Sequence, residues 1–525
     1  MTFRIVARRA PRIVVTLALL LLVVVSPALA ADGVRLLPTL DPLADSWQDQ
    51  AKVSGPIVVF CASPPAGEQT VFACNAGAVS PAPWSMRGLL AGTQLQPCVL
   101  TRGEVVRIVW AQYDASDELD LYLWEGSKTG VAASGFPMKL VDHAYGRNAA
   151  DPSIGVARVG AEDHVIVAWS DGPSIHGAGF AVVRWLDLSV DTDTDGTPDY
   201  KDTEFDPKTA GTQADPSAAA TQWQPDVGPK GVFWLDARTQ DPGALETSLG
   251  RLDLSGTAPL AALFHSEAAG SGFDAENVRA TATGAAWLRS ADYPGSGREP
   301  VAEAVGAAMK VVQFLGDPGE FDVEDGAYAL TGGHDGATDL DADVFFYTPS
   351  VGQKVGVCTV GADLYDEYKA QQEPAISAAP GGYRVVWADP RYSTGTLDEH
   401  MTIFQALVPT VTISVNRTAI RLGASVMFTA KVTPSFRGSP VKFQTGARHS
   451  MASGFGTSVW FTNLRTRKTK ALGTGSKTTW TCTPTAKGTY YWRVSFGGSF
   501  KYVSTAGYGA NHVPAASRWL KIVVK

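Results

Sequence analysis

The chain has 525 residues and a formal net charge of −8, but this charge is unevenly distributed along it. Residues 31–408 contain 23 Lys and Arg against 52 Asp and Glu, whereas residues 409–525 contain 17 Lys and Arg and no acid. This asymmetry excludes one uniform domain and indicates an acidic module followed by a basic module with an anionic partner. Five cysteines are too few for a fold held by disulfides, and without a Cys-x-x-Cys spacing they predict no zinc or redox site.

The first 30 residues have the pattern of a secretory signal peptide. Four arginines precede the mostly aliphatic run 13–25, and Ala28 and Ala30 occupy the small-residue positions of a cleavage site. The run is too short for an uncleaved membrane anchor, which needs about 20 residues. Twin-arginine export is the weaker alternative, because the residues around Arg8 and Arg9 match that signal poorly. Cleavage after Ala30 and a secreted or cell-surface protein without a membrane span are therefore expected.

Residues 31–54 are interpreted as an N-terminal segment before the first repeat. Shortly after it, Cys61 and Cys74 lie symmetrically about a turn near Gly67. We expect them to face each other across a hairpin and form a disulfide. A bridge between Cys98 and Cys358 is a further option, which would leave Cys482 unpaired.

Residues 55–408 repeat one phrase with a period near 50–55 residues. Each copy is an apolar strand that ends in Trp, followed by a turn of Asp, Arg, Gly and Pro and a second strand. The clearest copies end at Trp110, Trp169, Trp234, Trp287 and Trp387, and degenerate copies begin near residues 57 and 327. With no convincing amphipathic helix, this period predicts stacked β-blades that bury their apolar faces against one another.

These copies resemble the TolB-like propeller repeats of exported bacterial proteins, whose blades read roughly V-V-W-x-D-x-R-x-G-x-x-D-I-Y. The resemblance covers about 350 residues and is best at 383–404. It implies an all-β protein with a β-propeller of seven blades, or six if 55–87 is incomplete, and a binding or scaffolding role. The tryptophans are interpreted as packing between blades rather than as a carbohydrate platform. The Asp-x-Arg pairs at 236/238 and 389/391 are interpreted as turn-stabilising, with substrate contact as the alternative.

The loop 191–202 is the sharpest local motif. Carboxylates occupy its positions 1, 3, 5, 9 and 12, and Gly196 occupies position 6, a spacing that wraps oxygen ligands around a hard cation. The loop resembles the calcium loops of thrombospondin type 3 and dockerin-like repeats, although an Asp replaces the bidentate Glu and no helices flank it. We therefore expect structural calcium with a Kd of about 10⁻⁴–10⁻³ M; the alternative is a solvated acidic turn. The expected ligands are Asp191, Asp193, Asp195, Thr197, Asp199 and Asp202.

Residues 409–525 have the rhythm of a β-sandwich, with short strands separated by turn residues. The segments 423–426, 438–441 and 488–494 resemble the strand starts of bacterial immunoglobulin-like repeats, which implies an immunoglobulin-like domain. We expect its core to contain Trp460, Trp480 and Trp492. The densest basic run is the predicted anion-binding site and consists of Arg465, Arg467, Lys468 and Lys470.

Three interpretations of this basic surface stay open. The module could dock on an anionic cell-wall polymer or polysaccharide, it could dock on the acidic propeller and fix the domain orientation, or it could act only in solubility. A protein partner on the propeller face is also compatible with the sequence. No nucleic-acid-binding module is present, and predicted export argues against such a ligand.

The sequence contains no pattern that predicts an enzyme. The eight histidines are scattered, there is no Gly-x-Ser-x-Gly elbow, and Asp is too abundant in the turns for a glycosidase carboxylate pair to be selected. A binding or scaffold protein is therefore expected, and an extracellular polysaccharide hydrolase or lyase is the alternative. The central channel of the propeller would discriminate them, because converging carboxylates and histidines favour hydrolysis and an apolar plug excludes it.

Overall fold

The computed structural model describes most of the chain after residue 33. The described ranges are 34–36, 47–63, 68–78, 82–86, 92–142, 147–173, 180–216, 221–237, 247–266, 273–291, 298–312, 318–333, 342–348, 353–358, 372–389, 401–433, 440–446, 462–472, 475–496, 499–503, 508–512, 515–518 and 520–525. The predicted signal peptide, Trp460 and the arginines at 238 and 391 lie outside these ranges. Among the described residues no helix is long and apolar enough to cross a membrane.

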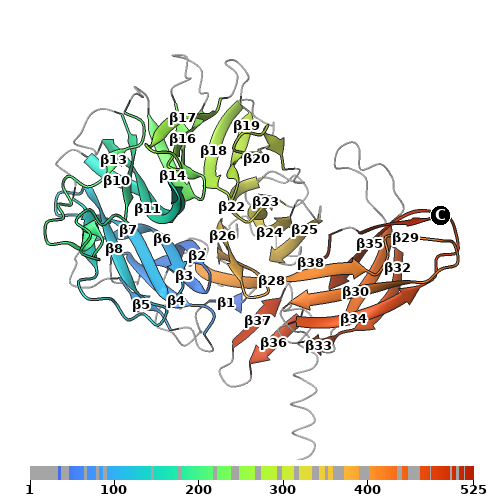
Figure 1. Cartoon of the computed structure of the whole chain (residues 1–525). Helices are drawn as coiled ribbons and strands as arrows, with labels where there is room; N and C mark the ends of the chain where they lie inside the picture. The colour runs from blue at the N-terminus through green and yellow to red at the C-terminus, as the bar shows by residue number, and fades with distance from the viewer. Residues whose placement is uncertain are drawn as a thin grey trace, which may run out of the picture.

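The described residues confirm an all-β protein with a β-propeller (Figure 1). Six four-stranded antiparallel sheets, the blades, follow one another along the chain and around a common axis. Blades 1 to 3 are β2 (Trp47–Ser54), β3 (Ile57–Ser63), β4 (Thr70–Asn75) and β5 (Trp84–Ser85); β6 (Gln94–Arg102), β7 (Val105–Tyr113), β8 (Leu119–Ser127) and β9 (Met138–Val141); β10 (Arg147–Val159), β11 (Glu162–Pro173), β12 (Val182–Asp187) and β13 (Thr212–Gln213). Blades 4 to 6 are β14 (Gln222–Gly228), β15 (Gly231–Asp236), β16 (Ser248–Asp253) and β17 (Leu260–His265); β18 (Phe273–Ala280), β19 (Gly284–Ala291), β20 (Glu299–Ala304) and β21 (Lys310–Val311); β22 (Pro318–Glu324), β23 (Ala327–Gly333), β24 (Ala342–Thr348) and β25 (Gln353–Cys358).

A seventh sheet closes the ring with strands from both ends of the propeller. It consists of β26 (Gln372–Ala379), β27 (Gly382–Asp389), β28 (Thr402–Val415) and the N-terminal β1 (Val34–Arg35). Val34 lies opposite Gln405, so β1 forms the outer strand beside β28. Residues 31–54, interpreted from the sequence as a separate segment, therefore contribute β1 and β2 to the propeller.

The repeated tryptophans pack between blades, as expected. Each lies in the second strand of its blade and is fully buried, which removes a large apolar surface from water. Two of the acids after them, Asp236 and Asp389, are buried and accept hydrogen bonds from the indoles. Their role in turns with the arginines at 238 and 391 stays a prediction, because those arginines lie outside the described residues. Trp234 Nε1 donates to Asp236 Oδ2 at 3.0 Å, and Trp387 Nε1 donates to Asp389 Oδ2 at 3.1 Å.

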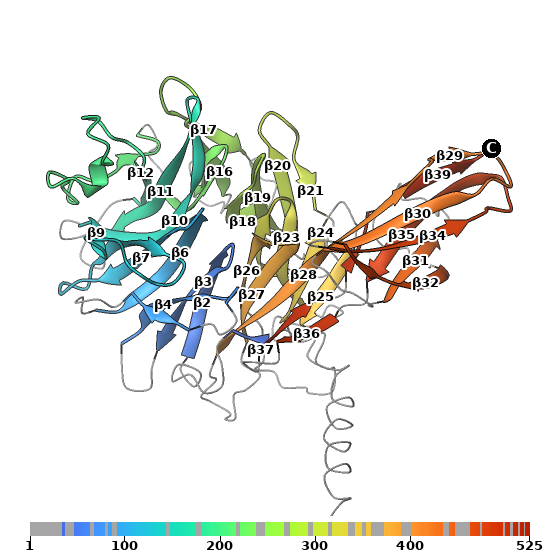
Figure 2. The ribbon, with the colours of Figure 1, turned by 60° about the horizontal axis from the view of Figure 1, so that its bottom comes forward.

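The C-terminal module consists of two sheets around one core (Figures 1 and 2). The first sheet has the order β28-β30-β34-β33 and the second has the order β29-β39-β35-β31-β32. Phe428, Phe443 and Trp492 are buried between them, and Trp480 packs against this cluster as expected. The strands are β29 (Ala419–Ile420), β30 (Val426–Thr433), β31 (Pro440–Gly446), β32 (Thr462–Lys468), β33 (Lys470–Leu472), β34 (Gly475–Cys482), β35 (Gly488–Phe496), β36 (Ser499–Val503), β37 (Tyr508–His512), β38 (Ala515–Ala516) and β39 (Leu520–Val524).

The strand β28 belongs to both modules. It pairs with β27 as far as Pro409 and with β30 from Thr410 onwards, so the predicted boundary at 408/409 lies within one continuous strand. The β36–β37 hairpin returns to the same strand, with His512 opposite Leu407 in a parallel pair. Backbone pairing therefore joins the C-terminal module to the propeller at two places.

Candidate functional site

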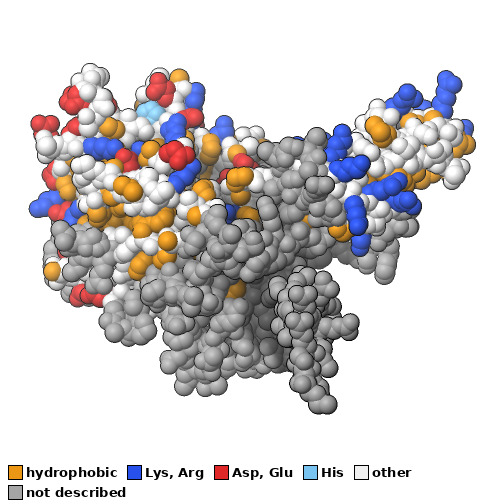
Figure 3. All heavy atoms as spheres, turned by 90° about the horizontal axis from the view of Figure 1, so that it is seen from below, with side chains coloured by type: hydrophobic (Ala, Val, Ile, Leu, Met, Phe, Trp, Pro, Cys, Tyr) orange, Lys and Arg blue, Asp and Glu red, His pale blue; other side chains and the backbone are white. Residues whose placement is uncertain are grey.

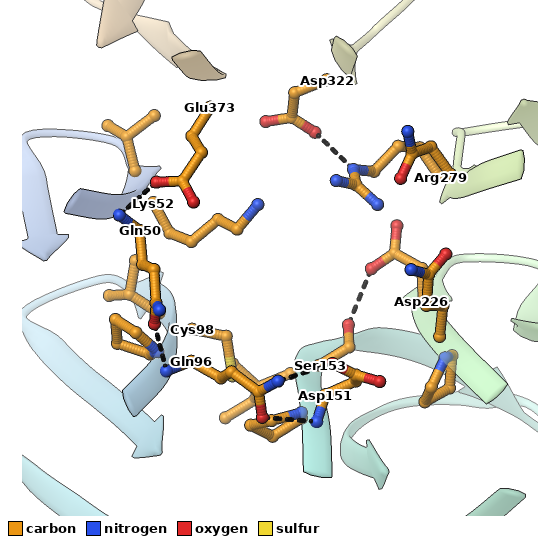
Figure 4. Close-up of a pocket in the computed structure, with 18 of the residues that line it drawn as sticks. Gln50, Lys52, Gln96, Cys98, Asp151, Ser153, Asp226, Arg279, Asp322 and Glu373 are labelled. Carbon is orange, nitrogen blue, oxygen red and sulfur yellow. Dashed lines mark hydrogen bonds and ion pairs between the residues drawn. The ribbon is translucent and has the colours of Figure 1, made fainter. Parts of the chain in front are cut away.

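The first strands of all seven blades line a cavity of about 420 Å³ on the propeller axis (Figure 4). Each of these strands contains a bulge near its middle, which turns a polar side chain toward the neighbouring blade. In six blades the bulge residue has φ between 48° and 52°, although it is not glycine. Such backbone costs about 1–3 kcal/mol per residue unless its surroundings hold it. These residues are Gln50, Gln96, Asp151, Gln224, Asn277 and Glu373.

Hydrogen bonds between blades hold most of these bulges. Glu320 accepts the backbone N–H of Glu373, and Glu373 accepts that of Gln50. Gln50 Oε1 then accepts the N–H of Gln96 at 2.6 Å, and Gln96 Oε1 accepts the N–H of Asp151 at 2.9 Å. This axial belt ties blades 6, 7, 1, 2 and 3 together through side chains that face the channel.

The axial belt is interrupted at blades 4 and 5. The N–H of Gln224 donates to Ser170 Oγ at 3.1 Å, and the N–H of Glu320 donates to Thr331 Oγ1 at 2.8 Å. The side-chain amides of Gln224 and Asn277 form no hydrogen bond with any described residue, although both line the cavity. They are available to a molecule in the channel.

A second tier of polar side chains lies two residues beyond the bulges. Asp226 Oδ1 accepts from Ser153 Oγ at 2.7 Å, and its Oδ2 accepts from the N–H of Ala280 at 2.6 Å. Asp322 Oδ2 accepts the N–H of Ile376 at 2.9 Å, and its Oδ1 lies 3.4 Å from Arg279 Nε. Both carboxylates therefore join neighbouring blades.

Lys52 differs from the rest of this tier. Its side chain extends toward the middle of the channel in Figure 4, and its ammonium forms no hydrogen bond or ion pair with any described residue. Burial and, secondly, the nearby Arg279 lower its pKa, while Asp322 and Glu373 act in the opposite direction. The lysine thus has distant counter-charges and no direct partner among the described residues.

Two further groups define the chemistry of the cavity. Burial, together with Asp49 and Glu320, raises the pKa of Glu373 to about 7. Burial also raises the pKa of the Cys98 thiol to about 12, which excludes a thiolate nucleophile near neutral pH. Carboxylates converge on the axis and the channel is not plugged by apolar side chains, but no histidine is among the described residues that line it.

The sequence analysis missed this site. Its signal is a polar residue followed by Pro, as in Gln96-Pro97, Asp151-Pro152, Gln224-Pro225 and Glu373-Pro374. Asp215-Pro216 has the same pattern but precedes β14 and does not line the cavity. The other three blades lack the proline, so this signal alone could not have located the complete ring.

The predicted calcium loop lies between β12 and β13 of the third blade. The carboxylates of Asp191, Asp193 and Asp195 lie within 4.8 Å of one another. Asp191 Oδ1 is buried and has no hydrogen-bond partner among the described residues. Asp199 instead accepts the N–H and the hydroxyl of Thr192, both at 2.6 Å.

The remaining loop positions contribute differently. Thr197 donates its N–H to Asp195, and the pKa of the Asp202 carboxyl is raised by desolvation and by the nearby Asp195 and Asp193. A short 3-10 helix, η2 (Asp199–Lys201), attaches the loop to blade 2, because Lys201 Nζ lies 2.7 Å from Glu125 Oε1. The structure thus brings three of the predicted ligands together and turns Asp199 toward Thr192.

The predicted basic run is divided between the two sheets of the C-terminal module. Arg465, Arg467 and Lys468 are exposed on β32, an edge strand of the second sheet. Lys470 is exposed on β33 in the first sheet, where it pairs with Lys477 of β34. Lys470 therefore belongs to a different sheet from the other three, although only Thr469 separates it from Lys468 along the chain.

Register adds two lysines that the sequence analysis did not select. Lys477 pairs with both Lys470 and Lys431, so these three lysines form a lateral row across β33, β34 and β30. All three are exposed, because alternate residues of β30, such as Ala430 and Val432, face the core. Figure 3 shows Lys and Arg over this module, at the right of the view, and the sequence provides no acid there. Linear spacing could not reveal this lysine row.

The predicted disulfide between Cys61 and Cys74 is wrong. Cys61 pairs with Val71 and Cys74 pairs with Val58, so the hairpin register differs by three residues from the symmetric one. An odd shift places the two side chains on opposite faces of the sheet. Accordingly, both are buried free thiols in separate clusters. Cys98 is also free, on the first strand of blade 2, whereas Cys358 lies on the outer strand of blade 6.

Comparison with solved structures gives distant matches to propeller proteins. Prolyl oligopeptidase B from Galerina marginata is 10% identical with a TM-score of 0.39, over 76% of this chain and 51% of that chain, so this chain spans about half its length. The β-propeller domain of the Trilobed protease from Pyrococcus furiosus is 8% identical with a TM-score of 0.40, over 69% and 95%. Trypanosoma rangeli sialidase is 10% identical with a TM-score of 0.36, over 91% and 88%.

These values carry no statement about activity. No protein-family model matches the chain, and no curated protein matches it in sequence. The propeller itself rests on the sheet order and the closed ring described above.

Proposed function

We propose that the protein is an exported binding protein whose C-terminal module docks on a linear anionic polymer of the cell envelope. The lysine row, Lys431, Lys477 and Lys470, is the observation that carries this proposal. Like charges directly opposite on neighbouring strands destabilise a sheet, and the module contains no acid that could compensate them. A bound polyanion would remove that repulsion.

The geometry favours a linear ligand that crosses the strands. Neighbouring strands lie about 4.8 Å apart, so adjacent ammonium groups are well within the Debye length of about 8 Å at physiological salt. Hydroxyls continue the same face: exposed Thr412 lies beside Lys431, and half-buried Thr429 lies opposite exposed Thr479. Such a face combines ion pairing with hydrogen bonding to a hydroxylated or phosphorylated chain.

The alternative in which the basic module serves as an electrostatic clamp on the acidic propeller is less favoured. The continuous strand β28 and the β37 contact already connect the modules through backbone hydrogen bonds. The lysine row is therefore not required for domain orientation.

A hydrolase or lyase is the second candidate, because carboxylates converge in the axial cavity. However, Asp226, Asp322, Glu320 and Glu373 each accept a backbone N–H from the next blade. These bonds account for the carboxylates as ties between blades, which supports a binding role.

The test uses the whole mature chain, because dividing it at residue 408 would cut β28. Binding to purified anionic wall polymer is measured over a salt series for the wild type and for the triple variant K431T/K470T/K477T. The control K208T/K230T/K310T removes the same charge from exposed propeller sites. We expect salt-sensitive binding that the row variant loses and the control retains. Equal loss in both variants, or binding unaffected by salt, contradicts docking through the lysine row.

Structural calcium in the loop is a separate part of the proposal. The three adjacent carboxylates and the unpartnered Asp191 Oδ1 support it. With a Kd of about 10⁻⁴–10⁻³ M, about 10 mM calcium would stabilise the fold by about 1.4–2.7 kcal/mol. Thermal melting with calcium, magnesium or a chelator measures this stabilisation. D193N should abolish it while the exposed control D117N keeps it, and equal melting temperatures in calcium and chelator would reject the site.

A further inference from the structure

Three polar side chains of the axial cavity have no hydrogen-bond partner among the described residues, two at the bulges and one in the second tier. On the bulge tier, the amides of Gln224 and Asn277 have no hydrogen-bond partner among the described residues. In the second tier, Lys52 has no direct partner, whereas Asp226 uses both carboxylate oxygens within the protein. These three free groups can donate hydrogen bonds.

Arg279 adds a second cation to this set. It uses Nε toward Asp322 and Nη1 toward the carbonyl of Val278 at 2.9 Å, which leaves Nη2 free for a ligand. Figure 4 shows Lys52 and Arg279 extending into the channel from different sides. Because both cations face the same channel, one negative group between them would interact favourably with both.

We propose that the axial cavity binds a small hydroxylated anion, with its charged head between Lys52 and Arg279 and its hydroxyl groups at Gln224 and Asn277. The shared chemistry is a carboxylate or phosphate on a body of monosaccharide size. A cavity of about 420 Å³ is within the usual range for small ligands, about 300–1,000 Å³.

The surrounding carboxylates do not make the site one for cations. Asp322 already pairs with Arg279, and both oxygens of Asp226 accept hydrogen bonds. Glu373 gives one oxygen to the N–H of Gln50, and with a pKa of about 7 it is half protonated at neutral pH. Asp151 and Glu320 also line the cavity and accept hydrogen bonds from Gln96 and Glu373. Each lining carboxylate therefore has at least one donor within the protein, whereas the ammonium of Lys52 has no direct partner among the described residues. This site is separate from the lysine row, so either proposal can fail alone.

Calorimetric titration of the whole mature chain tests the proposal with four probes. Glucuronate and glucose 6-phosphate carry the anionic head on a sugar, glucose lacks the charge, and acetate lacks the hydroxyls. We expect both anionic sugars to bind about tenfold or more tightly than glucose and acetate, because hydrogen bonds to charged groups are the stronger ones. The tighter of the two anionic sugars identifies the head group.

Variants assign the binding to the named residues. K52M should weaken the anionic sugars about tenfold or more, and N277A should weaken the sugars but leave acetate unchanged. K208M, which removes an exposed lysine elsewhere, should change nothing. Q224A serves as a second amide variant if K52M does not fold. The proposal is overturned if glucose binds as tightly as the anionic sugars, if K52M binds like the wild type, or if none of the probes binds at about 10 mM.

Discussion

E373Q is expected to stabilise the protein at pH 8 and to have almost no effect at pH 4. In the folded protein the pKa of Glu373 is about 7, whereas an unperturbed Glu has a value near 4.5. The folded state therefore binds more protons than the unfolded state between these values, so this group favours folding less as the pH rises from about 4.5 through 7. Glutamine retains the acceptor for the N–H of Gln50 and cannot ionise.

The magnitude follows from the same pKa difference. The pKa of Glu373 is about 2.5 higher in the folded state than in the unfolded state, and each pKa unit corresponds to about 1.36 kcal/mol. E373Q should therefore raise the free energy of unfolding by about 3 kcal/mol at pH 8 and by only a few tenths of a kcal/mol at pH 4. Denaturant unfolding of wild type and E373Q at both pH values measures the difference. The exposed control E104Q should change stability by less than about 0.5 kcal/mol at either pH. A pH-independent effect of E373Q, or destabilisation at pH 8, would refute the assignment of a raised pKa to this carboxyl.

Three further predictions concern the fold. W234F should cost about 1 kcal/mol more stability than W169F in denaturant unfolding. W234F removes the indole hydrogen bond to buried Asp236 Oδ2, which keeps the one from Gln222, whereas Trp169 Nε1 has no partner among the described residues. Equal costs would contradict this reasoning. Non-reducing peptide mapping of the purified protein should recover Cys61 and Cys74 in separate, uncrosslinked peptides, and a linked pair would show that the hairpin register is wrong. Insertion of four glycines between Pro409 and Thr410 should broaden the interdomain distance distribution in small-angle X-ray scattering. The same insertion after Gly256, in an exposed turn, should leave the distribution unchanged. Unchanged scattering of the first variant would mean that β28 does not set the orientation of the two modules.

The sequence predicted those parts of the fold that repeat locally. The Trp phrase has the same position in each blade because each indole fills the same space between sheets, so Trp110 and Trp387 were recognisable without a structure. Short strands such as β1 carry no such phrase, and their place depends on pairing with residues more than 300 positions away. Closure of the ring by β1 therefore could not be predicted from local pattern.

The candidate sites show the same contrast between features that are local in the sequence and features that are assembled from distant strands. The predicted calcium loop is contiguous, so its spacing was visible in sequence, but the turn of Asp199 toward Thr192 depends on backbone geometry. The axial cavity and the lysine row each collect one or two residues from several strands. Lys52 and Arg279 are 227 positions apart in the sequence, and both line the channel because blades 1 and 5 share an axis. Sequence distance hides such sites, and an error of three residues in register sufficed to misplace Cys61 relative to Cys74.

The shared strand β28 has a mechanical consequence. If the C-terminal module is held by a surface, drag on the propeller passes along β28, which is hydrogen-bonded to β27 over the residues from Thr402 to Pro409 and to β1 beside them. Tension along the strand would load these bonds together in shear, and slippage of β28 would release the N-terminal strand that closes the ring. The same strand thus connects the module to the propeller and holds the propeller ring closed, so one force would act on both.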